Sequence, residues 1–112
     1  MIRVAFFRKE GRIVGFESEG HAGYAESGSD IVCAAVSALL ISCANALESA
    51  AHVEPIVRQN DDIGYLKAEL PNALDEAHAH DAGIVLAVAE QGLQSIAKQY
   101  PEYVRVIMKN RR

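Results

Sequence analysis

The amino-acid sequence lacks an excess of basic side chains, and it lacks a metal-binding pattern. Its 112 residues contain 11 Lys and Arg against 15 Asp and Glu, a formal net charge of −4. This balance provides no broad basic surface for nucleic acid or an anionic membrane, although it does not exclude a basic peptide as substrate. No spacing of Cys and His resembles a zinc site. We therefore expect no metal, no cofactor and no direct nucleic-acid or membrane partner.

A signal peptide and a clean membrane span are also missing. Residues 1–9 are too charged for the apolar core of a signal peptide. The apolar run 31–47 is interrupted by polar residues and is shorter than the roughly 20 residues that a span needs. The only two cysteines, Cys33 and Cys43, fall in one expected helix about 15 Å apart, too far for a disulfide. We expect a cytoplasmic protein with two free thiols.

Neither an internal repeat nor a low-complexity linker divides the chain, and its length predicts a single domain over residues 1–112. Half of the residues (50%) are hydrophobic, which is enough for a core. Hydrophobic alternation, turn residues and helix caps predict the order ββαββαβ. The expected elements are strands at 2–7, 13–18, 53–59, 63–70 and 103–108, a helix from the cap Asp30 to about 51, and a second helix over about 74–99.

This order predicts an α+β two-layer sandwich, in which two helices pack on one face of a mostly antiparallel sheet. The first helix is apolar on nearly every face, so we expect it to be buried on most sides. The inner stripe of the second helix should consist of Val85, Val88, Ala89, Gly92 and Ile96. The other face of the sheet needs a cover for side chains of the first strand, namely Ile2, Val4 and Phe6 or their neighbours. A second copy of the chain would provide that cover.

Cys33 stands at the third position of the first helix if Asp30 is its N-cap. Unpaired N–H groups and aligned peptide dipoles give a helix N-terminus a partial positive charge, which favours the reactive thiolate form of a cysteine there. A free cysteine is usually a small buried apolar residue, and Cys43 in the middle of the helix fits that description. The position of Cys33 favours a nucleophile instead.

His21 lies in a glycine-rich loop, between Gly20 and Gly23 and upstream of Gly28. Glycines permit unusual backbone angles and the close approach of a ligand, and small polar loops can move. The loop over residues 22–29 can therefore bring the histidine over the helix start. An imidazole beside a thiol completes a nucleophile–base pair. The two motifs together predict a cysteine-dependent hydrolase.

The other three histidines are weaker candidates. His78 and His80 are two residues apart on a helix, about 200° around its axis, so they cannot share a metal. His52 follows the first helix, where a cation is favoured in any case.

Two further polar residues near the helix start each have two interpretations. Ser37 lies one turn after Cys33 on the same face, where it could donate a hydrogen bond to a substrate or bond back to the carbonyl of Cys33. Asp30 could act only as the N-cap, or it could also orient His21 as the third member of a triad. The cap alone accounts for the presence of Asp30.

These residues resemble the signature of the ribosomal-processing cysteine protease family, called Prp. The resemblance comprises Gly20-His21-Ala22-Gly23 and the segment 28–37, which includes Cys33. A second stretch, from 80–82 through 92–93 to 100–103, is similar to the C-terminal half of that family. The resemblance covers essentially the whole chain.

The resemblance implies a cytoplasmic, homodimeric cysteine endopeptidase. Its implied substrate is large-subunit ribosomal protein number twenty-seven, whose N-terminal extension the family removes after a phenylalanine in an apolar stretch, before ribosome assembly. By position, Cys33 matches the nucleophile and His21 its partner. Gly20, Asp30 and Ser37 match supporting or substrate-binding positions. The alternatives are a non-catalytic ribosome-assembly factor and a cysteine hydrolase of another substrate, such as a thioester.

Overall fold

The computed structural model describes residues 1–26 and 29–111 and confirms the predicted order of elements. Gly28, which closes the predicted loop, lies outside the described residues. The elements are β1 (Ile2–Lys9), β2 (Arg12–Glu19), α1 (Ile31–Ser49), β3 (Ile56–Asn60), the 3₁₀ helix η1 (Asp61–Ile63), β4 (Tyr65–Glu69), α2 (Glu76–Gln99) and β5 (Val104–Asn110).

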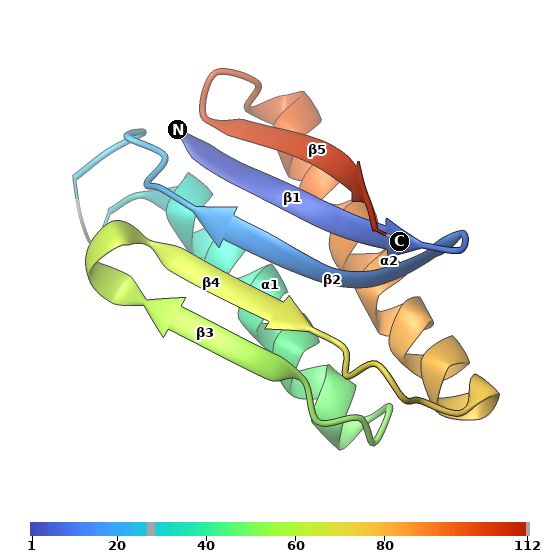
Figure 1. Ribbon diagram of the computed structural model, residues 1–112. Coiled ribbons are helices and arrows are strands. Elements are labelled where there is room, and N and C mark those ends of the chain that lie inside the picture. The colour runs from blue at the N-terminus through green and yellow to red at the C-terminus, as the bar shows by residue number, and fades with distance from the viewer. Residues whose placement is uncertain (27–28, 112) are drawn as a thin grey trace.

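The five strands form one sheet in the order β3-β4-β2-β1-β5 (Figure 1). All neighbouring strands are antiparallel except β1 and β5, which are parallel. Glu10 and Gly11 form the tight β1–β2 hairpin with positive φ angles of 53° and 80°. Both helices cover the same face of the sheet, so the predicted two-layer α+β sandwich is confirmed.

The core lies between the helices and the sheet. Phe6 and Phe16 of the sheet are fully buried, with ring centroids 6.1 Å apart, and leucines of both helices pack over them. Burying a side chain of this size stabilises the fold by about 1.5–3 kcal/mol. Ile2, Val4 and Phe6 all belong to this core. Of the two sets that the sequence left open for the uncovered side of the sheet, it is therefore the neighbours of these residues that face it.

The uncovered face of the sheet is mostly polar. Phe7 is buried there because the guanidinium of Arg111 lies 3.9 Å from its ring centroid and the ammonium of Lys67 lies 5.7 Å from it. Cations over an aromatic ring gain electrostatic attraction while they shield the ring from water. This face therefore has little apolar surface for a second copy of the chain to cover, in contrast to the expectation from the sequence.

α1 is buried along one stripe only, which corrects the expectation that it is buried on most sides. Its buried residues are Val32, Val36, Leu40, Cys43 and Leu47. Ile31 and Ile41 are 55% and 43% exposed, because the sheet and α2 contact the helix on one side and leave the other side free. By length and composition α1 could even cross a membrane, with a mean hydropathy of 1.9, contrary to our reading of the run 31–47. Here its buried stripe belongs to the core of the fold.

The inner stripe of α2 differs in part from the prediction. The buried residues are Ala82, Leu86, Ala89 and Leu93, whereas Val88 is 55% exposed. The spacing of 82, 86, 89 and 93 places two leucines toward the core, where their long side chains fill more space than valine would. Val85 and Ile96 pack at the margin of the core. An added Cβ at Gly92 would lie 2.5 Å from Cδ2 of Leu39, so the two helices approach closely here.

Every strand differs from its predicted range at one end or both, and the starts of β3 and β4 differ for a clear reason. β3 begins at Ile56 rather than at 53, directly after Pro55, which cannot donate a backbone hydrogen bond. β4 begins at Tyr65 rather than at 63, because Asn60 caps η1 by accepting the N–H of Asp62 at 3.1 Å. Gly64 then ends η1 with a φ of 61°. The turn that the sequence predicted at 60–62 is thus longer and more ordered.

Candidate active site

Cys33 is the third residue of α1 and is half-buried, as the capping argument predicted. Oδ1 of Asp30 accepts the backbone N–H groups of Val32 at 3.0 Å and of Cys33 at 2.9 Å. Asp30 is therefore the N-cap of the helix. Cys43, in contrast, is buried in the core, and burial raises the pKa of its thiol. The two cysteines thus occupy the two different environments that the sequence indicated.

The second oxygen of Asp30 holds the loop that precedes the helix. Oδ2 accepts the N–H groups of Tyr24 at 3.0 Å and of Ala25 at 3.3 Å. Hydrogen bonds from backbone N–H groups, that of Cys33 foremost, lower the pKa of the Asp30 carboxyl. Within the described part of the chain, Asp30 has no hydrogen bond to His21. Its contacts are those of a cap and a loop clamp, not of the third member of a triad.

The loop after β2 returns to the thiol. The backbone N–H of Ala22 donates a hydrogen bond to Sγ of Cys33 at 3.2 Å, and Ala22 itself is buried. Tyr24 anchors the same loop on the end of α2, with its ring centroid 5.8 Å from that of Tyr100 and 5.2 Å from that of Tyr103, both edge-to-face. The glycine-rich loop therefore does fold back over the helix start.

His21 and Cys33 line the same cavity, which has a volume of about 190 Å³. The imidazole is exposed, and its Cε1 lies 3.1 Å from the point where a Cβ on Gly64 would stand. The hydrogen bonds among residues 1–26 and 29–111 do not include one between His21 and the thiol. A base that is loosely placed without substrate and tightens in the complex is common among enzymes.

Gly20 and Ser37 also line this cavity. The φ of Gly20 is +97°, and a Cβ there would collide with the carbonyl oxygen of Met1, so only glycine fits. Ser37 is exposed to the cavity side of α1, and its hydroxyl makes no hydrogen bond to the Cys33 carbonyl within the described segments. This placement favours the cavity-lining interpretation of Ser37 over the helix-bonded one.

The sequence matches the family model described as "Cysteine protease Prp" over residues 1–105. The chain belongs to the Prp family. It is therefore a cysteine protease, as the family resemblance implied. The ribosomal processing cysteine protease Prp of Bacillus subtilis (strain 168) is 35% identical over 94 residues, 84% of each chain. That of Staphylococcus aureus is 29% identical over 97 residues, 87% of this chain and 88% of the relative.

Solved structures of Prp proteases share the whole fold. The S. aureus Prp in complex with a covalently linked product peptide has a TM-score of 0.86 at 29% identity, covering 97% of this chain and 100% of that one. Its complex with a substrate peptide has a TM-score of 0.81 at 28% identity, with the same coverage. The protein SMU.848 from Streptococcus mutans has a TM-score of 0.86 at 32% identity, covering 99% of this chain and 96% of that one.

The connection between β3 and β4 completes the cavity, and sequence reasoning missed it. Gln59, Asp61, Gly64 and Tyr65 all line the same hollow as Cys33. The amide of Gln59 donates to Oδ1 of Asp61 at 2.9 Å, and the N–H of Gly20 donates to the carbonyl of Ile63 at 3.3 Å. Figure 1 shows η1 and the loop after β2 at the same end of the sheet. The only sequence signal was Gly64, two residues after the predicted turn at 60–62.

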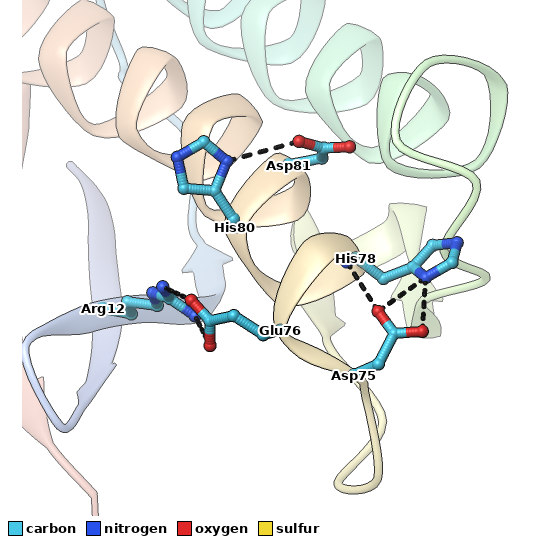
Figure 2. A network of polar contacts seen from close by, with 6 residues as sticks. All are labelled: Arg12, Asp75, Glu76, His78, His80 and Asp81. Carbon is cyan, nitrogen blue, oxygen red and sulfur yellow. Dashed lines mark hydrogen bonds and ion pairs between the residues drawn. The ribbon is translucent and has the colours of Figure 1, made fainter.

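A second polar cluster lies at the opposite end of the sheet (Figure 2). Arg12 forms an ion pair with Glu76, and Asp75 caps α2 by accepting the N–H of His78 at 2.9 Å. Nδ1 of His78 lies 2.8 Å from Oδ1 of Asp75, and Nδ1 of His80 lies 3.3 Å from Oδ1 of Asp81. Among the residues that the structure describes, no three His, Cys, Asp or Glu gather as a metal site. This cluster fixes the start of α2, and its residues do not line the cavity that contains Cys33.

Proposed function

We propose that this Prp-family protease removes the N-terminal extension of large-subunit ribosomal protein number twenty-seven before that protein joins the ribosome, with Cys33 as nucleophile and His21 as its base. The observation that carries the proposal is the meeting of Cys33 and His21 in one cavity at a capped helix start. Support for a ribosomal substrate comes from the relatives in B. subtilis and S. aureus, which are named as ribosomal processing proteases.

The first chemical step transfers the thiol proton of Cys33 to the imidazole of His21. The sulfur then attacks the carbonyl carbon of the scissile peptide bond, and the carbonyl π electrons move to the oxygen. The N–H groups of Val32 and Cys33 already donate hydrogen bonds to the Asp30 carboxylate, so they are not free to bind this oxyanion. The Ala22 N–H lies 3.2 Å from the sulfur and is a donor that can turn to the oxyanion.

The second half of the reaction releases both products. The tetrahedral intermediate collapses as the imidazolium of His21 gives its proton to the leaving amine, which leaves an acyl thioester on Cys33. A water molecule then attacks the thioester carbonyl while His21 accepts a proton from the water, and the thiol is restored. Ser37, on the cavity side of α1, is placed to donate a hydrogen bond to the bound peptide.

Substrate entry requires the loop before α1 to move. Ala22 is buried against the sulfur, and the Asp30 carboxylate and the Tyr100–Tyr103 pair hold the next residues of the loop. The Ala22 N–H covers one side of the sulfur, so movement of the loop widens the approach for a carbonyl group. The proposal therefore includes opening of this loop as a step before chemistry.

Cleavage of matched substrates tests the proposed function. The purified protein is incubated with ribosomal protein number twenty-seven carrying an N-terminal extension, and separately with the same protein lacking it, and both are read by intact mass. The expected result is a single mass loss, after a phenylalanine, in the extended protein only. An unchanged mass of the extended protein, or cuts at many sites in both, would refute the assignment of this substrate.

We also propose a cytoplasmic location and a homodimer. The two free thiols, Cys33 and Cys43, fit a reducing compartment. Ile84 and Val88 are 54% and 55% exposed one turn apart on α2, which gives the helical layer an apolar surface that a second copy could cover.

A further inference from the structure

The edge strand β3 extends the sheet beyond the cover of α1. Val57 pairs with Ala68, and Ala68 pairs with Phe16, so these three side chains point to the helical side of the sheet. Ala68 and Phe16 are fully buried, whereas Val57 is 47% exposed. The apolar helical side of β3 is therefore open.

A groove follows from this arrangement. It has a volume of about 320 Å³ and runs between β3 and the outer side of α1, lined by Ile41, Ala44, Val57 and Leu66 among others. We call it the α1–β3 groove. It shares Ile41, Gln59 and Leu66 with the cavity that contains Cys33. The groove therefore adjoins the cavity that contains Cys33.

The groove has the length of a peptide segment. Its far end is lined by Glu48 and Glu54, and Glu48 follows Cys33 by fifteen residues on the same helix. At 1.5 Å per residue this separation is about 22 Å along the helix axis. An extended peptide advances about 3.3 Å per residue, so six or seven substrate residues span it.

The charge of the groove selects the kind of peptide. Glu48 and Glu54 lie at the far end, and Asp61 lies in the protease cavity at the near end. In the portion of the chain that the structure describes, no Lys or Arg lines either hollow. The formal net charge of the whole chain is −4. The surface therefore attracts a peptide with a positive charge beyond an apolar segment.

We propose that the α1–β3 groove is a specificity site for an extended substrate segment with apolar side chains over Ile41 and Val57 and a basic residue, six or seven positions from the scissile bond, at Glu48 and Glu54. The inference rests on the proposed function, since it places the scissile bond at Cys33. An exposed ion pair gains little and is screened by salt, so the selectivity is modest and greatest at low ionic strength.

A peptide series tests this site. One short peptide covers only the residues around the scissile bond. Longer peptides carry Lys, Gln or Glu six or seven residues away, on either side of it. At low salt, and on one side of the scissile bond only, kcat/KM for the Lys peptide should exceed kcat/KM for the Glu peptide by about two- to fivefold. The difference should come from a lower KM, with kcat unchanged. The preference should disappear at high salt.

Variants assign the preference to the groove. The double variant Glu48→Gln with Glu54→Gln should cleave the Lys and Glu peptides with equal kcat/KM. Glu54→Lys should give the Glu peptide the higher kcat/KM. Glu102→Gln, an exposed carboxylate outside both hollows, is the control with the same change of charge per site. Equal kcat/KM for Lys, Gln and Glu at every position, while the short peptide is cleaved, overturns this inference alone. No cleavage of the short peptide by the wild type overturns the proposed function as well.

Discussion

Asp30 has a larger structural role than a helix cap, because one carboxylate accepts four backbone N–H groups from two segments. Its position also changes the expected chemistry at the helix start. The two helix N–H groups that could have stabilised an oxyanion are occupied, and the carboxylate charge opposes part of the helix dipole near the thiol. The N–H of Ala22 is left as the donor at the sulfur.

Replacing His21 tests the base. His21→Ala should lower kcat/KM by at least ~10²-fold, the low end for general acid–base catalysis. In a Cys43→Ala background, the same change should slow alkylation of Cys33 by iodoacetamide at neutral pH, because the proton acceptor is gone. His80→Ala, at the opposite end of the sheet, is the control and should behave as wild type in both assays. Turnover of His21→Ala close to wild type would leave His21 with a structural role only.

Replacing Asp30 separates its two structural tasks. Asparagine is a good N-cap, but its NH₂ group cannot accept the N–H groups of Tyr24 and Ala25. Asp30→Asn should therefore keep α1 stable and release the loop, with turnover lowered more than Tm. Asp75→Asn changes the equivalent cap of α2 and should leave turnover unchanged. Equal turnover for both variants would show that the loop clamp has no part in activity.

The effect of Asp30→Asn on stability should depend on pH, because the pKa of Asp30 differs between the folded and unfolded states. The pKa of Asp30 is lowered from an ordinary value of 3.8, so its ionised form stabilises the folded state above that pH. This contribution is lost as the pH falls through the lower, folded-state pKa. The Tm difference between wild type and Asp30→Asn should thus be full near neutral pH and shrink below about pH 4. A difference that is constant from pH 2 to 7 would contradict the charged role.

At the scale of secondary structure, the buried face could be predicted for elements whose apolar residues recur at a clear period. It could not be predicted for an element that is apolar nearly throughout. Alternating apolar residues in β1, and a cap residue before each helix, predicted the order and most boundaries. The run in α1 is apolar on nearly every side, so its sequence contains no clear period from which the buried face follows. Which side is buried depends on where α2 and the sheet lie, and that is a property of the tertiary structure.

The loop before α1 can be tested with a pair of matched glycines. Gly23 and Gly11 have φ angles of +71° and +80°, and an added Cβ would meet nothing within 4 Å at either. Alanine in this left-handed conformation costs roughly 1–2 kcal/mol at each site. Gly23→Ala and Gly11→Ala should therefore lower Tm alike, but only Gly23→Ala should lower kcat/KM, because only Gly23 lies in the loop over Cys33. Full activity of Gly23→Ala would mean that the loop backbone does not govern the site.

At the scale of the whole molecule, the site forms where three segments meet that are distant in sequence. Cys33 and His21 could be predicted because local signals, a capped helix and a glycine-rich loop, mark them. Asp61 and Gly64 could not, because they reach the cavity only through the pairing of β4 with β2. That strand order depends on packing of the complete chain and has no local signature.

Assembly is the second prediction at this scale. Light scattering at micromolar concentration should give about twice the chain mass of 12.1 kDa. Val88→Glu places a charge on the exposed apolar patch of α2 and should shift the protein toward the monomer, whereas Ile107→Glu on the polar sheet face should not. A monomer mass for the wild type would refute the homodimer. Equal effects of the two variants would refute the choice of surface.

The most direct test of the account is the nucleophile itself. Cys33→Ala and Cys43→Ala are purified, shown to be folded by circular dichroism, and incubated with the extended ribosomal protein. Intact mass of that protein follows the reaction over time. The account predicts no mass loss with Cys33→Ala, because the attacking sulfur is gone, and near-normal cleavage with Cys43→Ala, whose thiol lies in the core. Cleavage by folded Cys33→Ala at a rate near that of the wild type would contradict it.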